Sequence, residues 1–226
     1  MSDGHDVVAT VRRMGEAPPG SHAVVVDARQ PAMLAALGPF DAVVANAGIT
    51  NFCALEDMTD EELDEVFETN LLGPLRLVRT VLPAMRAAGG GRLVVVSSQS
   101  AYLPTPFVAA YSASKAGLEI AIESLAGEVR PFGVRCTLVL PGATSTDMAR
   151  KAVRTIPSGS PYFGAAQATG ERCDGVVGGG VDPSVVAVAI AAVLADGDPP
   201  MRVVIGDETV DNIARFRPVD ARFLRG

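Results

Sequence analysis

A tyrosine and a lysine stand four residues apart in the segment YSASK, as Tyr111 and Lys115. On a helix, this spacing puts both side chains on one face, one turn apart. A free tyrosine has a pKa of about 10 and is a poor acid or base at neutral pH, but a neighbouring ammonium favours the phenolate and lowers that pKa. The pair is therefore typical of a site that moves a proton to or from an oxygen atom.

The composition makes Lys115 unusual, because Lys151 is the only other lysine in a chain that is rich in arginine. Lys115 also lies in line with the apolar residues Leu118 and Ile122 at helical spacing. A lysine on a solvated helix face would have polar neighbours along that line. We therefore expect the ammonium of Lys115 to lie inside the protein, next to Tyr111.

Three further polar motifs each end or follow a run of apolar residues. If those runs are parallel strands, the motifs meet at the carboxyl edge of one sheet, where open α/β sheets bind ligands. Each motif alone is an ordinary strand-ending turn, but together they predict one rim of a site. They are Asn46-Ala47-Gly48 after 42–45, Ser97-Ser98 at the end of 92–98, and Pro141-Gly142 after 134–140, with Thr144 and Thr146 just beyond.

The elements that must position these residues alternate along the chain. Helices are predicted over 59–88, which opens with the capping box of Thr59 and Glu62, and over 111–129 and 182–197. Short runs that are apolar throughout are typical of strands buried on both faces. They cover 7–11, 23–26, 42–45, 92–98, 134–140 and 201–205. The pattern predicts one α/β domain over 1–226 with a doubly wound parallel sheet, and a mobile loop over about 148–181, which is rich in Gly, Ser and Pro.

Asn70 lies among apolar residues in the first predicted helix, four residues before Pro74. Proline has no N–H, so the main-chain carbonyl of Asn70 loses its usual helical donor and the helix should kink there. Such a carbonyl could hold a water molecule. From this feature alone, a kink without any role is an equally good interpretation.

The composition excludes several classes of function. The net charge of −7 and a pI of about 4.9 argue against a nucleic-acid partner. No apolar stretch is long enough to span a bilayer, and the first residues lack the pattern of a signal peptide. The three cysteines are widely spaced and lack metal-ligand spacing, so we expect reduced thiols, no metal and a cytoplasmic protein.

In order and spacing, the motifs resemble the short-chain dehydrogenase/reductase family. They are NAG, an asparagine in the next helix, a serine thirteen residues before the tyrosine of YxxxK, and PG followed by threonine. The likeness runs from His5 to about Asp211. It implies a Rossmann-like fold with helices on both faces of the sheet. It also implies hydride transfer between a nicotinamide cofactor and a carbonyl or secondary alcohol.

The resemblance implies a role for each matching residue. Tyr111 would be the general acid/base, and Lys115 would lower its pKa and hold the nicotinamide ribose. Ser98 would polarise the substrate carbonyl, and Asn70 would anchor the water of a proton relay. The loop with Met148, Tyr162 and Phe163 would cover the substrate. The cofactor would contact Arg12, Arg13, Asp27, Ala28, Asn46, Ala47, Gly48, Tyr111, Lys115, Pro141, Gly142, Thr144 and Thr146.

Two arginines bear on the choice of cofactor. Arg12 and Arg13 end the first apolar run, where an acidic residue would select NAD and an arginine would accept the 2′-phosphate of NADP. We therefore expect NADP rather than NAD. Asp27 matches the family position near the adenine.

The sequence departs from the family pattern at its beginning. The family starts with a strand and a TGxxxGxG turn that holds the pyrophosphate, and this sequence contains no such turn. Aligned by its motifs, the chain begins at the family's second strand, as if its start were recorded too late. We expect a sheet without the first strand and its helix. The resulting gap of roughly 10 Å would be closed by sliding strands or left between two unpaired edges.

Three functions remain open at this point. The first is an NADP-dependent oxidoreductase, which would form a homodimer or homotetramer through the helices around 60–87 and 111–130. The second is a lyase, isomerase or cyclase that uses Tyr111, Lys115 and Ser98 without a cofactor. The third is a non-catalytic partner of a full-length relative.

Overall fold

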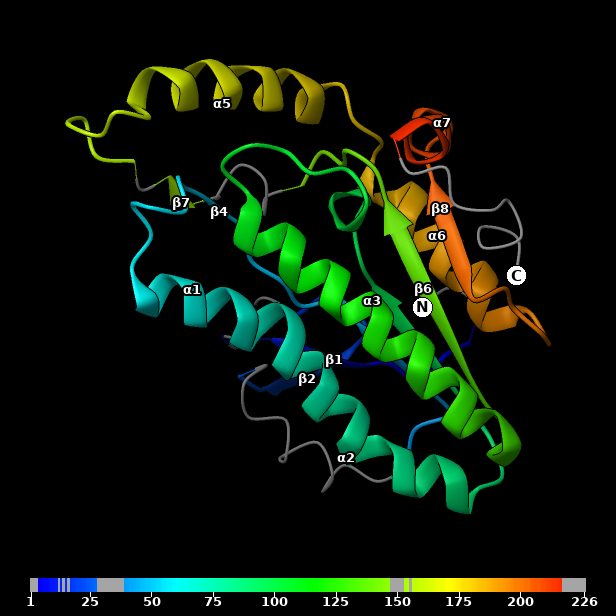
Figure 1. The fold of residues 1–226 in the computed structure, drawn as a ribbon. Helices are drawn as coiled ribbons and strands as arrows, with labels where there is room; N and C mark the ends of the chain where they lie inside the picture. Colours follow the sequence, from blue (N-terminus) through cyan, green and yellow to red (C-terminus); the bar gives the residue numbers. More distant parts are fainter. Residues whose placement is uncertain are drawn as a thin grey trace.

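The computed structural model describes residues 4–11, 13, 15, 17–27, 39–146, 153–154 and 156–216. Strands and helices alternate along this chain (Figure 1). The strands are β1 (Val8–Val11), β2 (His22–Val25), β3 (Ala42–Ala45), β4 (Asn51–Phe52), β5 (Gly91–Val96), β6 (Val134–Pro141), β7 (Val153–Arg154) and β8 (Arg202–Ile205). The helices are α1 (Asp60–Phe67), η2 (Glu68–Leu72), α2 (Gly73–Ala87), η3 (Gln99–Ala101), α3 (Ala109–Val129), η4 (Arg130–Phe132), α5 (Phe163–Gly178), α6 (Pro183–Ala195) and α7 (Asp207–Phe216).

The main sheet has four parallel strands in the order β3-β5-β6-β8. Each of its strands overlaps one of the predicted apolar segments. Helices cover both faces of the sheet, as the sequence predicts. Parallel strands need crossover connections, and α1, α2, α3 and α6 provide them. Figure 1 shows α3 in front of β6 and α6 behind it.

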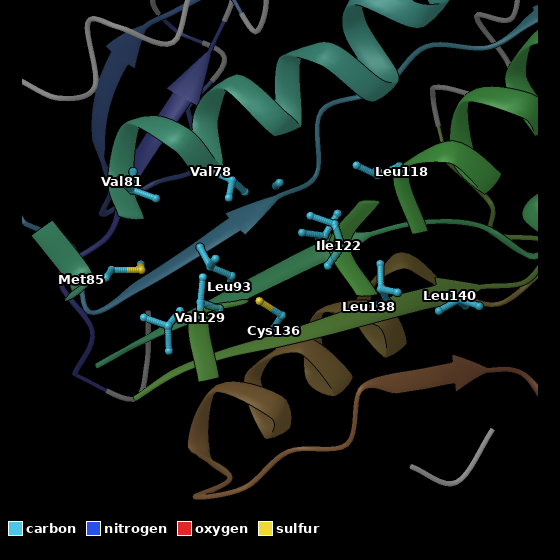
Figure 2. Packing of buried hydrophobic residues seen from close by; sticks show 13 residues of the cluster. Val78, Val81, Met85, Leu93, Leu118, Ile122, Val129, Cys136, Leu138 and Leu140 are labelled. Atoms are coloured by element: carbon cyan, nitrogen blue, oxygen red, sulfur yellow. The ribbon is translucent and has the colours of Figure 1, made fainter. Parts of the chain in front are cut away.

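Alternate residues of the central strands enter two separate cores. Leu93 and Val95 of β5 pack with α2 and α3, whereas Val94 packs with α6. Figure 2 shows Leu118 and Ile122 of α3 reaching toward the sheet, and both are fully buried. Because successive residues of a strand point to opposite faces, a strand that is covered on both sides must be apolar throughout. This requirement explains the uninterrupted apolar runs.

Strands β1 and β2 form a parallel pair of their own, with Val8 opposite His22 and Val11 opposite Val25. Within the described residues, neither strand has a hydrogen-bonded register with β3. Of the two expected outcomes, closure by sliding strands is therefore wrong for this structure. In the part of the chain that the structure describes, the two strands form a sheet separate from the main one.

The predicted mobile loop over 148–181 is wrong for most of its length. Residues Phe163–Gly178 form helix α5, and Val153–Arg154 form β7, which pairs with β4. The glycines of this segment indicated a loop, but a helix tolerates them where tertiary contacts outweigh their low propensity. Ala166, Thr169 and Gly170 supply those contacts, because all three are buried. Met148 lies outside the described residues.

The helices give no sign of a membrane span. In the ranges that the structure describes, none of them is both long and apolar enough to cross a bilayer.

Candidate active site

The carboxyl end of β5 carries the two serines of the site. Ser97 continues the strand pairing, since its N–H donates to the Val139 carbonyl at 2.8 Å. Ser98 then turns the chain away from the sheet as the N-cap of η3, and its Oγ accepts from the N–H of Ser100 at 3.1 Å. Strand pairing therefore holds the main chain of Ser97 at the edge of the sheet, and the helix cap holds the hydroxyl of Ser98 beside it.

Helix α3 positions the tyrosine and the lysine. Leu118 and Ile122 anchor its inner face in the main core. On the same side, Tyr111 is 8% exposed and Lys115 is 4% exposed. The predicted burial of Lys115 beside Tyr111 is therefore confirmed.

The ammonium of Lys115 is directed at the sheet. Its Nζ donates to the Val96 carbonyl at 2.9 Å and lies 6.0 Å from the centre of the Tyr111 ring. Burial lowers the pKa of Lys115 to about 8, and the nearby carboxylate of Glu119 opposes this effect. The lysine is thus buried and hydrogen-bonded to a strand carbonyl, and the charge of Glu119 acts on it.

The expected lowering of the Tyr111 pKa is not what the structure shows. Burial raises the pKa of Tyr111, and a hydrogen bond with Ser98 opposes this rise. The physical reason is that a phenolate loses its hydration inside the protein. The ammonium of Lys115, meanwhile, is hydrogen-bonded to Val96. Ser98 is therefore the group in this structure that favours the phenolate.

Asn70 lies in the short π-helical segment η2, between α1 and α2, and is fully buried. A π turn at this point agrees with the expected irregularity before Pro74, which has no N–H to donate. The side chain of Asn70 also holds the segment after β3, because it exchanges two hydrogen bonds with the main chain of Ile49. Its Nδ2 lies 3.1 Å from Ser114 Oγ, and Ser114 Oγ in turn donates to the Tyr111 carbonyl at 2.7 Å. Asn70 is thus linked through Ser114 to the main chain of Tyr111, near the start of α3.

One large cavity, of about 1470 Å³, joins the predicted rim of the sheet to these side chains. Most of the predicted site residues line it. They are Asp27, Asn46, Ala47, Gly48, Ser98, Tyr111, Lys115, Pro141, Gly142, Thr144 and Thr146.

Two of the predicted site residues that the structure describes, Arg13 and Asn70, do not line this cavity. Arg13 is exposed and is not among the lining residues. Arg12 and Ala28 lie outside the described residues. Among the described residues, no contact bears on the predicted 2′-phosphate site.

The sequence interpretation missed part of the cavity wall. Helix α5 contributes Thr169, Arg172 and Val176, and α6 contributes Val186 and Ile190. Residues of α5 went unnoticed because the segment was expected to be a loop. The sequence could have indicated the role of α6, because residues 183–195 are apolar on more of the helix surface than packing against a sheet requires.

Comparisons with known proteins agree with this fold and site. Residues 21–157 match the family described as short chain dehydrogenase. The chain is 31% identical over 175 residues to Oxidoreductase BOA17 of Botryotinia fuckeliana, and the match covers 77% of this chain. The fold is similar to that of a short-chain dehydrogenase from Streptomyces avermitilis, with a TM-score of 0.81 and 33% identity over 98% of this chain and 86% of that one. A metagenomic short-chain oxidoreductase solved in complex with NADP gives a TM-score of 0.69 at 26% identity, covering 90% of this chain and 86% of that one.

The chain belongs to the short-chain dehydrogenase family. The sequence match spans 64% of the length of Oxidoreductase BOA17, which is less than two thirds of that relative.

Proposed function

We propose that the protein is an oxidoreductase that transfers a hydride between NADP(H) and a carbonyl or secondary alcohol. The observation that carries the proposal is the convergence of Tyr111, Ser98 and Lys115 on one cavity at the carboxyl edge of the sheet. Ser98 follows the end of β5, and Tyr111 and Lys115 both lie on α3, so one strand and one helix position all three side chains. Family membership supports the same class of reaction.

The residues of the cavity fit a nicotinamide and its ribose. The cavity has room for a dinucleotide-sized ligand, and Asn46, Gly48 and Gly142 line it at the strand ends where such sheets bind nucleotides. Lys115 and Tyr111 are the residues that would hold the ribose. When bound, the nicotinamide supplies the hydride chemistry, which no side chain provides.

The chain's own residues then handle the proton. Tyr111 donates its phenolic proton to the substrate oxygen during reduction and takes it back during oxidation. Ser98 hydrogen-bonds the same oxygen and favours the phenolate, in line with its effect on the pKa of Tyr111. Lys115 places its ammonium 6.0 Å from the centre of the Tyr111 ring. Asn70 anchors the relay water through its main-chain carbonyl, which Pro74 deprives of its usual helical donor.

The preference for NADP over NAD has separate support. It rests on Arg12 and Arg13 in the sequence and on the similar metagenomic oxidoreductase that was solved with NADP. The substrate is a moderately apolar carbonyl or alcohol, because valine and isoleucine side chains of α5 and α6 line the cavity.

Calorimetric titration of NADPH and NADH into this chain tests the proposal. We expect NADPH to bind more tightly than NADH. We also expect NADPH oxidation with ketone substrates to fall by about 10²–10⁴-fold in Tyr111→Phe, while cofactor binding is retained. Failure of both cofactors to bind would contradict the proposal. Substrate turnover in cofactor-free buffer that Tyr111→Phe abolishes would instead favour a lyase or isomerase.

A further inference from the structure

Helix α3 carries a further buried polar residue, Glu119, one turn beyond Lys115. Glu119 is 2% exposed, although a carboxylate is among the side chains least often found fully buried. Its Oε1 accepts from Ser97 Oγ at 2.6 Å, and its Oε2 accepts from the Tyr102 hydroxyl at 2.5 Å. Both carboxylate oxygens therefore accept a hydrogen bond from a side-chain hydroxyl.

The guanidinium of Arg202 also lies against the carboxylate of Glu119. Arg202, the first residue of β8, is 6% exposed and places its Nε 3.5 Å from Glu119 Oε2 and 3.0 Å from the Tyr102 hydroxyl. Its second arm reaches Glu123 at 2.5 Å. The buried network thus extends from the catalytic helix to the edge strand of the sheet.

Three successive turns of α3 meet three successive residues at the end of β5. Tyr111 is hydrogen-bonded with Ser98, and Lys115 donates to the Val96 carbonyl. Glu119 accepts from Ser97, the residue between those two. The contact between Glu119 and Ser97 therefore holds the same strand end that carries Ser98, the serine of the proposed site.

The charges around Glu119 come from three elements. Lys115 and Glu123 lie on α3, Tyr102 follows η3, and Arg202 comes from β8. Burial raises the pKa of Glu119 above its ordinary value, and the bonds from Ser97 and Tyr102 and the charge of Arg202 limit this rise. A buried charge that is paired and fully hydrogen-bonded can persist where an isolated one would be neutralised. The carboxylate can therefore act on Lys115, whose pKa it raises against the effect of burial.

We propose that Glu119 is a positioning residue: its negative charge keeps the Lys115 ammonium charged beside Tyr111, and its hydrogen bond to Ser97 fixes the strand end beside Ser98. This inference rests on the proposed function for its consequence in catalysis. The electrostatic coupling itself needs neither cofactor nor substrate. Arg202, Tyr102 and Ser97 serve to hold the carboxylate ionised at this depth.

The scarcity of lysine makes the coupling directly measurable. With lysine labelled at ¹³Cε, the full chain gives two signals, and Lys151→Arg identifies the one from Lys115. We expect Glu119→Gln to lower the Lys115 titration midpoint by about half a pH unit or more, because a nearby negative charge is lost. Glu123→Gln is the matched control, since it removes the same charge one turn further from Lys115. An unchanged midpoint in Glu119→Gln, or an equal shift in Glu123→Gln, would overturn the proposal.

A second measurement avoids dependence on the folding of Glu119→Gln. Coupling between two sites is reciprocal, so removal of the lysine charge must affect the carboxylate equally. In Lys115→Met, we expect the ¹³C signal of the Glu119 carboxyl to titrate at a higher pH than in the unmodified chain. The same value in both proteins would contradict the coupling.

An activity assay adds the catalytic consequence. If the proposed function holds, Glu119→Gln lowers kcat/KM about tenfold at neutral pH and shifts its pH profile, whereas Glu123→Gln leaves the profile in place. If neither variant nor the unmodified chain shows turnover while the Lys115 midpoint still shifts, the coupling stands and the proposed function fails. If turnover is normal and its pH profile does not move in Glu119→Gln, the positioning role fails.

Discussion

The side chain of Asn70 and the main chain of Ile49 form a closed pair of hydrogen bonds. The Ile49 N–H donates to Asn70 Oδ1 at 2.8 Å, and Asn70 Nδ2 donates to the Ile49 carbonyl at 2.9 Å. An amide side chain can satisfy an N–H and a carbonyl at once, whereas aspartate lacks the donor. This pair joins the segment after β3 to the π turn before α2.

Asn70→Ala should therefore destabilise the fold. Its loss leaves the main-chain groups of Ile49 without their partners, and an unsatisfied buried group costs about 1–3 kcal/mol. We expect the free energy of unfolding in urea to fall by about 2–4 kcal/mol. Asn46→Ala is the control, because Asn46 is exposed at the end of β3 and its loss should cost less than about 0.5 kcal/mol. Equal stability of the two variants would contradict this role of Asn70.

Burial of Lys115 predicts a pH dependence of stability. Its pKa is lowered to about 8 in the folded protein from the ordinary value of 10.5. Between these values, the unfolded chain binds more protons than the folded one, so stability rises with pH. The cost of burying the ammonium is fully present below pH 8 and disappears toward pH 10.5.

The difference between the unmodified chain and Lys115→Met isolates this effect. Measured by urea unfolding from pH 7 to 10, the unmodified chain should gain about 1–3 kcal/mol relative to Lys115→Met. Tyr111→Phe should keep the same rise between pH 8 and 10, because the raised pKa of Tyr111 acts only above its ordinary value of 10. A difference between the chains that stays constant across this range would show that Lys115 is not a buried cation.

Gly142, at the end of β6, has no room for a side chain. A Cβ there would lie 2.0 Å from Thr209 Oγ1 and 3.3 Å from the Ile205 carbonyl oxygen. Gly142→Ala should therefore displace the start of α7 and cost about 1–3 kcal/mol. Adding Thr209→Ala removes the closest atom and should recover part of the loss.

Gly175 in α5 is the matched control for this crowding. A Cβ there meets nothing within 4 Å, so Gly175→Ala should raise stability by up to about 1 kcal/mol through helix propensity. Thermal unfolding of both single variants and of the double variant with Thr209→Ala checks the argument. Equal effects of the two glycine substitutions would exclude a steric cause.

Two hydroxyls attach the segment before α5 to the segment after β4. Ser160 Oγ donates to Asp57 at 2.6 Å, and the Tyr162 hydroxyl donates to Glu56 at 2.6 Å. In the double variant Ser160→Ala/Tyr162→Phe, we expect the α5 amides to exchange with solvent about tenfold faster, since local opening costs less. Ser158→Ala, in the same exposed segment, should leave the exchange unchanged. Unaltered protection of α5 in the double variant would show that other contacts hold it.

The sequence by itself determined the main sheet and the rim of the site. Both follow from backbone geometry: a strand covered on two faces is apolar throughout, and residues four apart share a helix face. The positions of Ser98, Tyr111 and Lys115 could therefore be placed at one edge without a structure. The irregular turn at Asn70 was also predictable, because Pro74 removes a helical donor.

Only the tertiary structure decided the electrostatics and the outer elements. The pKa of Tyr111 is raised rather than lowered, since burial depends on everything that packs around α3. Glu119 reads in the sequence as an ordinary helix residue, but Arg202, 83 positions further along the chain, lies against its carboxylate. Helix α5 forms where glycines indicate a loop. Spacing along the chain sets which residues share a face, but burial and counter-charges come from contacts between distant segments, and no local pattern contains them.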